Sequence, residues 1–389
     1  MSGFKLKSNN KRLREGRITT AHGKLSTPFF MPDATRAFVK GNTTDDVKRA
    51  QTEAMVVNTF HLYLQPGREL IKKAGGVHAF MDWNGPLLSD SGGFQVFSLI
   101  HRSSGMGKID DEKVSFKSPI DGSKHELTPE KSIQIQFELG VDMMVCLDDC
   151  PPNDWPKDKL ALAVKRSLEW AARCKAEYLR QLKRRKIEES KRPLLFAVVQ
   201  GGDYEDLRRD CAAALVAIGF DGYGFGARPV DKDGIFLADT LFKTASFIPE
   251  NSLRFALGVG TPEDIYRCYL MGWDMFDCVI PTREGRHGKL FFFNESFKGF
   301  KAPTGKQGPI SKFPKFYAAK NISNAAYATD FSPINPCSDI AELRQYSKAF
   351  LHHLFRLKEP LGQKLASLNN LEFYNRLMRE LRKIKQNSV

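Results

Sequence analysis

Short apolar runs alternate with longer, helix-like stretches along most of the chain. Eight runs predict buried strands, because each is apolar and most are bounded by Gly, Pro or an acid; they cover residues 26–32, 54–60, 86–91, 141–148, 193–202, 222–226, 254–260 and 275–280. Helix starts lie between them, with capping residues at Thr43-Thr-Asp-Asp46, Thr128-Pro129 and Thr261-Pro-Glu-Asp264. A long helical stretch runs from about residue 157 to 186. Strands alternating with helices predict an α/β protein with a (β/α)₈ TIM barrel.

A doubly wound open sheet is the alternative α/β architecture. Its usual marker is a glycine-rich dinucleotide-binding sequence after the first strand, which this chain lacks. One segment departs from the βα alternation: residues 113–127 alternate polar and apolar and contain Asp121-Gly122. That pattern predicts a β-hairpin insertion.

Polar residues stand at the carboxyl ends of five predicted strands. They are Asp90, Asp148, Gln200, the Gly226-Ala227 step and Asp277. In a barrel these ends form one rim, and that rim is where active sites lie. We therefore expect these residues to line one site.

Asp277 lies in an otherwise apolar run between Phe276 and Cys278. An unpaired acid buried there would lose several kcal/mol of hydration, so its position needs a reason. One interpretation is an ion pair with a nearby arginine, Arg283 or Arg286, which we expect in a Gly-containing turn. The other is a carboxylate that faces a pocket, with these arginines beyond it to hold an anionic substrate.

Two carboxylates match the needs of a retaining displacement at a sugar carbon, in which one acid attacks and the other moves a proton. Asp277 and Asp90 are the candidate pair. A planar base could be bound by Asp148 as acceptor and Gln200 as donor, and guanine offers the matching edge. Exposed backbone N–H groups near Gly226 would add donors. Phe94 and Leu257 could enclose the faces of the base.

Net charge, cysteine content and hydropathy predict the kind of partner, the state of the thiols and the compartment of the protein. The chain has 59 Lys and Arg against 45 Asp and Glu, a net charge of +14, which favours a polyanionic partner such as nucleic acid. Its seven cysteines are widely spaced, which predicts reduced thiols. The absence of a long apolar run or a signal peptide predicts a cytoplasmic protein without membrane segments.

Several longer motifs resemble the signature sequences of tRNA-guanine transglycosylases. They are NTFHLYLQPG (58–67), LLSDSGGFQVFSL (87–99), VQGG (199–202), GVGTPED (258–264) and MFDCVIPTREGRHG (275–288). The resemblance implies a TIM barrel that exchanges guanine at wobble position 34 of GUN-anticodon tRNAs for a 7-deazaguanine base, a step of queuosine biosynthesis. It also implies a homodimer and no redox cofactor.

The resemblance implies a role for each matching residue. Asp277 corresponds to the nucleophile and Asp90 to the general acid/base. Base recognition falls to Asp148, Gln200, Gly226 and the N–H of Ala227, with Ser91 beside the acid/base, Phe94 stacking and Leu257 opposite; Arg283 and Arg286 contact the flanking tRNA nucleotides. The barrel, with its N-terminal extension and insertions, would span residues 1–330. A C-terminal helical subdomain would span 331–389 and contribute tRNA-backbone and dimer contacts.

Family members usually bind zinc through a CxCxxC run and a later histidine, and this chain departs from that pattern. The corresponding positions hold Ser338, Ile340, Leu343 and Asn369, while Cys337 is one residue out of register. This set cannot provide the N/S ligands that zinc requires, so we expect no zinc and a packed apolar replacement. His352 and His353 nearby are expected to be structural.

A second departure lies in GARPVDK (226–232), where the family usually has GGLxxGE. Arg228 and Lys232 add positive charge to a loop that faces the 7-substituent, which disfavours a protonated aminomethyl group. Val230 instead favours a small base. The inserted base, whether preQ1, queuine or preQ0, stays open. The alternative functions are a non-catalytic tRNA-binding subunit and a transglycosylase that acts on DNA or at another tRNA position.

Overall fold

The computed structural model describes residues 3–10, 13–102, 105–300 and 315–384. At its centre lies an eight-stranded sheet in which all adjacent pairs are parallel. In sheet order the strands are β4 (Phe29–Pro32), β14 (Met275–Cys278), β13 (Leu253–Ala256), β12 (Gly222–Phe225), β11 (Leu194–Val199), β10 (Met143–Val145), β6 (Leu87–Asp90) and β5 (Met55–Asn58). Seven of the eight predicted runs contain one of these strands, and the run 254–260 overlaps β13, which begins one residue earlier.

The two ends of this sheet meet just beyond β4. Asp33 forms a parallel bridge with Val56, and the N–H of Ala34 donates to the carbonyl of Val56 at 2.7 Å. The N–H of Asn58 donates to the carbonyl of Thr35 at 3.3 Å. This contact nearly closes the sheet, which confirms the (β/α)₈ barrel over the open doubly wound alternative.

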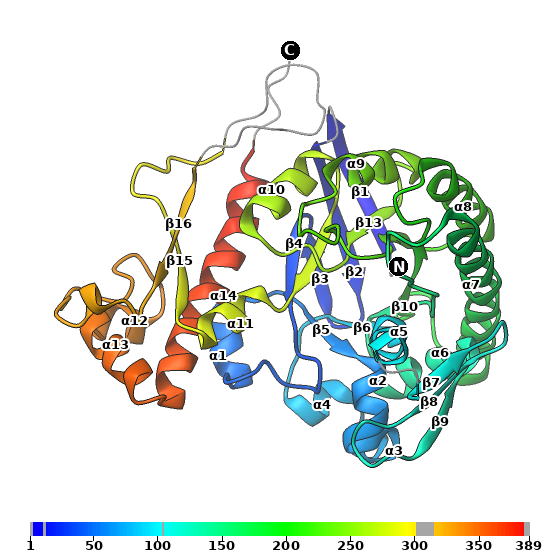
Figure 1. Cartoon of the computed structure of the whole chain (residues 1–389), viewed down its shortest axis with the longest axis horizontal. Helices are drawn as coiled ribbons and strands as arrows, with labels where there is room; N and C mark the ends of the chain where they lie inside the picture. Colours follow the sequence, from blue (N-terminus) through cyan, green and yellow to red (C-terminus); the bar gives the residue numbers. More distant parts are fainter. Residues whose placement is uncertain (1–2, 11–12, 103–104, 301–314, 385–389) are drawn as a thin grey trace.

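Helices surround the barrel, with α7 and α8 along one side and α14 along the other (Figure 1). Thr43, Thr128 and Thr261 cap helices through their side chains, as the sequence predicts. The helices are α1 (Thr44–Arg49), α2 (Thr59–Leu62), α3 (Arg68–Lys73), α4 (Val77–Met81), α5 (Gly93–Arg102), α6 (Pro129–Leu139), α7 (Lys157–Arg185), α8 (Glu205–Ile218), α9 (Ala238–Phe247), α10 (Pro262–Leu270), α11 (Ile280–Arg286), α12 (Ala341–Gln345), α13 (Lys348–Arg356) and α14 (Pro360–Arg382), with a π-helix at Tyr63–Gly67 and a 3₁₀-helix at Ala325–Tyr327. Within the described residues, none of the helices has the length and apolar character needed to cross a bilayer.

A three-stranded antiparallel sheet precedes the barrel, in the N-terminal extension, where the sequence analysis predicted no strand before residue 26. It consists of β1 (Gly3–Asn10), β2 (Leu13–Thr20) and β3 (Gly23–Ser26). Ile18 and Leu25 are almost fully buried and belong to the same apolar cluster as the barrel interior. The sheet thus covers the N-terminal end of the barrel strands and leaves the C-terminal end open for a site.

Several predicted strand boundaries are wrong, and the first and last predicted strands show why. The first predicted strand, 26–32, is divided between β3 and β4, and Pro28 between them lacks the N–H that continued pairing would need. The last strand ends at Cys278, and Arg283 and Arg286 lie on helix α11 rather than in a turn. Pro281 occupies the first turn of this helix, a position that proline favours because no N–H is required there.

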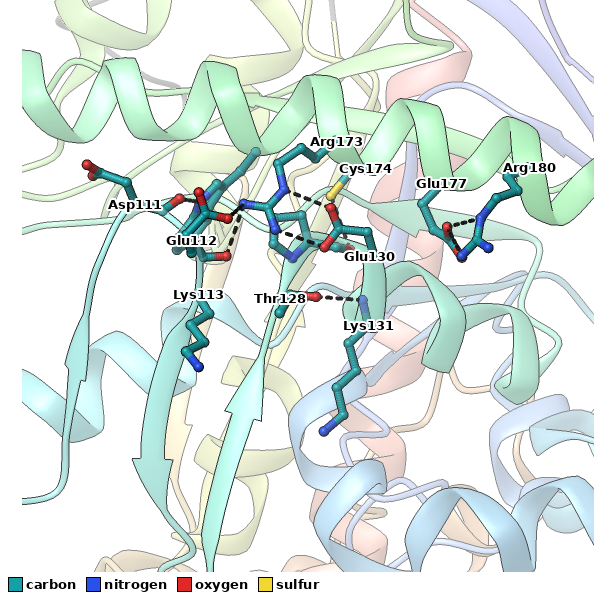
Figure 2. Close-up of polar contacts among 12 residues, drawn as sticks. Asp111, Glu112, Lys113, Thr128, Glu130, Lys131, Arg173, Cys174, Glu177 and Arg180 are labelled. Atoms are coloured by element: carbon teal, nitrogen blue, oxygen red, sulfur yellow. Dashed lines mark hydrogen bonds and ion pairs between the residues drawn. The ribbon is translucent and has the colours of Figure 1, made fainter.

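The predicted hairpin is present and has a third strand. Strands β8 (Val114–Lys117) and β9 (Lys124–Leu127) pair with β7 (Gly107–Ile109) in one antiparallel sheet. Arg173 on α7 joins this insertion to α6, because its guanidinium donates to Glu112, between β7 and β8, at 3.1 Å and to both carboxylate oxygens of Glu130 on α6, at 2.7 and 3.0 Å (Figure 2).

The C-terminal helices pack on the barrel. Helix α14 lies between the barrel and the antiparallel pair β15 (Lys289–Phe293) and β16 (Tyr317–Asn321), with α12 and α13 beyond (Figure 1). The hydroxyl of Tyr374 on α14 donates to the carbonyl of Gly260 at 2.6 Å, and the Asn375 amide donates to the carbonyl of Ala50 at 2.7 Å. These buried bonds fix α14 against loops at both ends of the barrel.

Candidate active site

A cavity of about 580 Å³ opens at the C-terminal ends of the barrel strands. Nine of the eleven residues predicted for the site line it: Asp90, Ser91, Phe94, Asp148, Gly226, Ala227, Leu257, Asp277 and Arg283. Gln200 lies directly behind this lining, bonded to Asp148. Arg286 lies one helical turn from Arg283 on α11, and its Nη1 is buried without a hydrogen-bond partner among the described residues. The strand-end pattern thus predicted side chains that the fold brings to one cavity.

Asp277 faces this cavity from the end of β14. Its Oδ1 accepts a hydrogen bond of 2.9 Å from the N–H of Gly258. Arg283 pairs with Glu284 at 3.5 Å, and no ion pair joins Asp277 to an arginine within the described part of the chain. Burial, with the negative charge of Asp33, raises the pKa of Asp277 to about 7. The geometry therefore contradicts the ion-pair interpretation and leaves the carboxylate directed at the cavity.

Asp90 enters the same cavity from the end of β6. The amide of Asn58, which lies opposite it on β5, donates to Asp90 Oδ2 at 3.5 Å. Burial raises the pKa of Asp90 well above its usual value, and the charges of Asp277 and Asp33 raise it further. Of the two carboxyl groups, Asp90 therefore has the pKa that its surroundings raise through more negative neighbours, Asp277 among them. Environments that separate two carboxyl groups in this way are typical of acid–base and nucleophile pairs.

Asp148 and Gln200 form the polar wall on the next strands. The Gln200 amide donates to Asp148 Oδ2 at 2.6 Å, and burial raises the pKa of Asp148 to about 7. A Cβ on Gly226 would lie 2.5 Å from the Gln200 side chain, so glycine is required at this position. Ala227 adopts a left-handed backbone with φ of 85°, which is unusual for a residue with a Cβ and marks local strain.

The remaining predicted residues form the sides of the cavity. Phe94 on α5 has a side chain that is 49% exposed, so one face of its ring is available for stacking. Leu257 follows β13 and packs close to Gly224. Ser91 is buried, and its hydroxyl accepts from the N–H of Gly93 at 3.1 Å, so that it shapes the turn after Asp90.

Asp33, Asn58 and Cys150 are among the cavity residues that the sequence analysis did not predict. Asp33 and Asn58 follow β4 and end β5, so the strand-end rule that found the other acids also applies to them. Cys150 is half-buried near Asp148, and desolvation raises the pKa of its thiol to about 12. The Gln200 amide and the N–H of Ala227 hydrogen-bond to this thiol and oppose that rise.

The positions that correspond to the family's zinc ligands do not fit a metal. Ile340 and Leu343 are buried in the main apolar cluster. The Ser338 hydroxyl donates to Glu372 at 2.6 Å, and Asn369 accepts from the Asn335 amide at 2.9 Å. Two apolar side chains and two engaged polar ones leave no set of N/S donors for zinc.

A second group of possible metal ligands lies at the opposite end of the barrel. His22, His78 and Asp142 bring one ligand atom each within 4.8 Å of one another. His22 Nδ1 lies 2.9 Å from Asp142 Oδ1, and His78 Nε2 lies 3.3 Å from Oδ2 and 3.1 Å from the carbonyl of Gly85. His22 Nδ1 and His78 Nε2 each face an oxygen acceptor, so each is placed as an N–H donor. The cluster therefore fits a hydrogen-bonded clamp better than a metal site.

Two carboxyl groups at the mouth of a (β/α)₈ barrel are the arrangement that a retaining displacement at a sugar carbon requires. The chain matches the family model described as queuine tRNA-ribosyltransferase over residues 9–389. It is 40% identical to a queuine tRNA-ribosyltransferase of Halothermothrix orenii over 373 residues, covering 96% of this chain and 90% of the relative. It is 40% identical over 380 residues to one of Aliivibrio fischeri, with 98% and 92% covered.

The chain therefore belongs to the queuine tRNA-ribosyltransferase family, the tRNA-guanine transglycosylases that its motifs resemble. This membership confirms the predicted fold and enzyme class. A tRNA substrate follows from the family.

Proposed function

We propose that the chain exchanges guanine at position 34 of GUN-anticodon tRNAs for a 7-deazaguanine base, preQ1 or queuine, by two displacements through a covalent enzyme–tRNA intermediate. The main support is that Asp90 and Asp277 line one cavity together with Asp148. A short anticodon loop suits this cavity, because an unpaired base leaves its stack at low cost.

In the first displacement, Asp277 attacks C1′ of the target ribose. The C1′–N bond to guanine breaks as an ester bond to Asp277 forms, and protonated Asp90 supplies a proton to the departing base. The raised pKa of Asp90 supports this assignment, since a general acid must hold its proton at the working pH.

In the second displacement, Asp90 accepts the proton of the incoming base and the base attacks C1′. The ester breaks, and Asp277 returns to its carboxylate form. Asp148, Gln200, Gly226 and the N–H of Ala227 orient each base, with Phe94 and Leu257 on its faces and Ser91 supporting the turn that holds Asp90. Arg283 and Arg286 contact the flanking nucleotides, and this role is supported by Nη1 of Arg286, which has no hydrogen-bond partner among the described residues.

The test is exchange of radiolabelled guanine into tRNA by the Asp277→Asn variant, with an acid-quenched gel for the covalent adduct. We expect exchange and adduct to be lost. Asp210→Asn, which changes an exposed carboxylate paired with Arg209 on α8, serves as control and should keep full activity. Full exchange by Asp277→Asn would remove the proposed nucleophile.

This test also separates the alternative functions. A non-catalytic tRNA-binding subunit would show no exchange even as the wild-type chain. An enzyme for DNA or for another tRNA position would exchange guanine into a different nucleic acid, so GUN-anticodon tRNA, other tRNAs and DNA are compared in parallel.

The loop after β12 decides which base is inserted. Val230 and Arg228 line the cavity, and the Asn153 amide holds the Arg228 carbonyl at 2.9 Å. Bulk from Val230 favours a small 7-substituent. Mass spectrometry of tRNA after separate incubations with preQ1, preQ0 and queuine identifies the inserted base. Val230→Gly should allow the enzyme to accept queuine, which has the largest 7-substituent of the three.

Further properties complete the proposal. Residues 331–389 act as a subdomain for tRNA-backbone and dimer contacts, the enzyme works as a homodimer in the cytoplasm, and it functions without zinc. The support for the last point is the apolar filling by Ile340 and Leu343. Light scattering tests the dimer, and metal analysis of the purified protein tests for zinc.

A further inference from the structure

The order of strands around the barrel divides the cavity into a base side and a sugar side. Asp148, Gln200 and Gly226 follow β10, β11 and β12, which are adjacent. Asp90 on β6 and Asp277 on β14 flank this arc, one on each side. With the base held by the arc and C1′ between the two acids, the rest of the ribose points towards β4 and β5, the strands that complete the circle.

Asp33 stands at that position with one oxygen unused. Its Oδ1 accepts from the N–H of Thr35 at 2.8 Å and from the Thr35 hydroxyl. Its Oδ2 has no hydrogen-bond partner among the residues that the structure describes, although the side chain lines the cavity. A carboxylate oxygen in a cavity is a strong acceptor that calls for a donor.

Electrostatics agree with this placement. The charge of Asp33 raises the pKa values of both Asp90 and Asp277, so the side chain lies within reach of both acids. Of the nucleotide groups near C1′, the 2′-hydroxyl is the one donor, because the 3′ oxygen of an internal nucleotide is esterified. Phosphate oxygens would repel a carboxylate.

We propose that Asp33 Oδ2 accepts a hydrogen bond from the 2′-hydroxyl of the target nucleotide and thereby selects RNA over DNA. The inference rests on the proposed function, because it requires Asp277 to attack C1′. Acidic side chains bind ribose hydroxyls in nucleotide-binding folds, and hydrogen bonds to the sugar hydroxyl beside the reacting carbon strengthen in the transition state of glycosyl transfer. The 2′-hydroxyl is also the group by which proteins distinguish RNA from DNA.

A purely structural role for Asp33 is the competing explanation, since the bond from Thr35 forms a local Asx turn. Asp33→Asn separates the two roles. Asparagine keeps a carbonyl oxygen for both Thr35 donors, but it replaces the unused acceptor by an NH₂ donor. The turn is preserved, and the acceptor for the sugar is lost.

The experiment uses anticodon stem-loop RNAs that carry either guanosine or 2′-deoxyguanosine at the target position. We measure kcat/KM for labelled-guanine exchange by the wild type, by Asp33→Asn and by the control Asp210→Asn. The wild type should prefer the ribo substrate by about 10- to 150-fold, the effect of one hydrogen bond to a charged group. Asp33→Asn should reduce the ribo rate by a similar factor and bring the ribo-to-deoxy ratio close to one. Asp210→Asn should keep the wild-type ratio.

The ratio isolates the sugar contact. Removing the charge of Asp33 also changes the pKa values of Asp90 and Asp277, but that change acts on both substrates and cancels. An unchanged ratio in Asp33→Asn would overturn the inference while leaving the transglycosylase activity intact. A wild-type enzyme that exchanges no guanine would instead overturn the proposed function. A melting temperature of Asp33→Asn equal to that of the wild type would verify that the turn persists.

Discussion

The Gln200 side-chain amide donates a 2.6 Å hydrogen bond to Oδ2 of Asp148, linking the ends of two adjacent barrel strands. The bond holds a buried carboxylate in one orientation at the cavity wall. Because Gly226 has no side chain, Gln200 can occupy the space that this bond requires. An acceptor fixed in this way suits the N–H donors along one edge of guanine.

Changing Asp148 to Asn should impair base recognition without preventing tRNA binding. The substitution replaces a carboxylate by an amide whose NH₂ group faces the donors of guanine. Loss of a hydrogen bond to a charged group costs about 1.5–3 kcal/mol, so kcat/KM for guanine should fall by about 10- to 150-fold. Steady-state exchange kinetics measure the fall, and a tRNA gel-shift assay provides the control. Weakened tRNA binding with unchanged use of guanine would contradict the assignment.

Formation of the covalent intermediate should increase with pH through about 7. Asp277 has a raised pKa of about 7, so below this pH it is protonated and cannot attack, whereas above it the carboxylate is present. Asp33→Asn removes a nearby negative charge, which should lower this pKa and shift the curve towards acid pH. Single-turnover adduct formation between pH 5.5 and 8.5 gives both curves. A rate that falls as pH rises through 7 would exclude Asp277 as the ionised nucleophile.

Chelators should not lower the thermal stability of the protein, because apolar packing replaces the zinc site. Leu343 is fully buried, so Leu343→Ala should reduce the free energy of unfolding by about 2–5 kcal/mol. Leu357 is 59% exposed, so Leu357→Ala should change the free energy of unfolding by less than about 0.5 kcal/mol. Thermal unfolding with and without EDTA, together with denaturant titration of both variants, tests the interpretation. Destabilisation by EDTA would reveal a bound metal.

The clamp at the closed end of the barrel should make stability depend on pH. Hydrogen bonding to Asp142 raises the pKa of His22, so the protonated imidazole stabilises the fold below its usual pKa. This contribution is lost as pH rises through the raised pKa of the folded state. His22→Ala should therefore lower the melting temperature more at pH 6 than at pH 8.5. His353→Ala, on an exposed position of α13, should show no such difference.

The sequence alone determined the eight barrel strands and most of the site. Short apolar runs are readable locally, and the strand-end rule then identified Asp90, Asp148, Gln200 and Asp277, because all parallel strands of a barrel end at one rim. The replacement of the family's zinc ligands was also evident from the sequence, because it depends only on which residues stand at those positions. Family motifs supplied the reaction that spacing alone could not.

Only the tertiary structure decided how these residues meet. It revealed the N-terminal sheet, whose polar-looking strands become partly buried when Ile18 and Leu25 cover the barrel end. It also brought Asp33, distant in sequence, close to Asp90 and Asp277. The charge state of Asp277 depends on its burial and on this neighbour, and neither is a property of the local sequence.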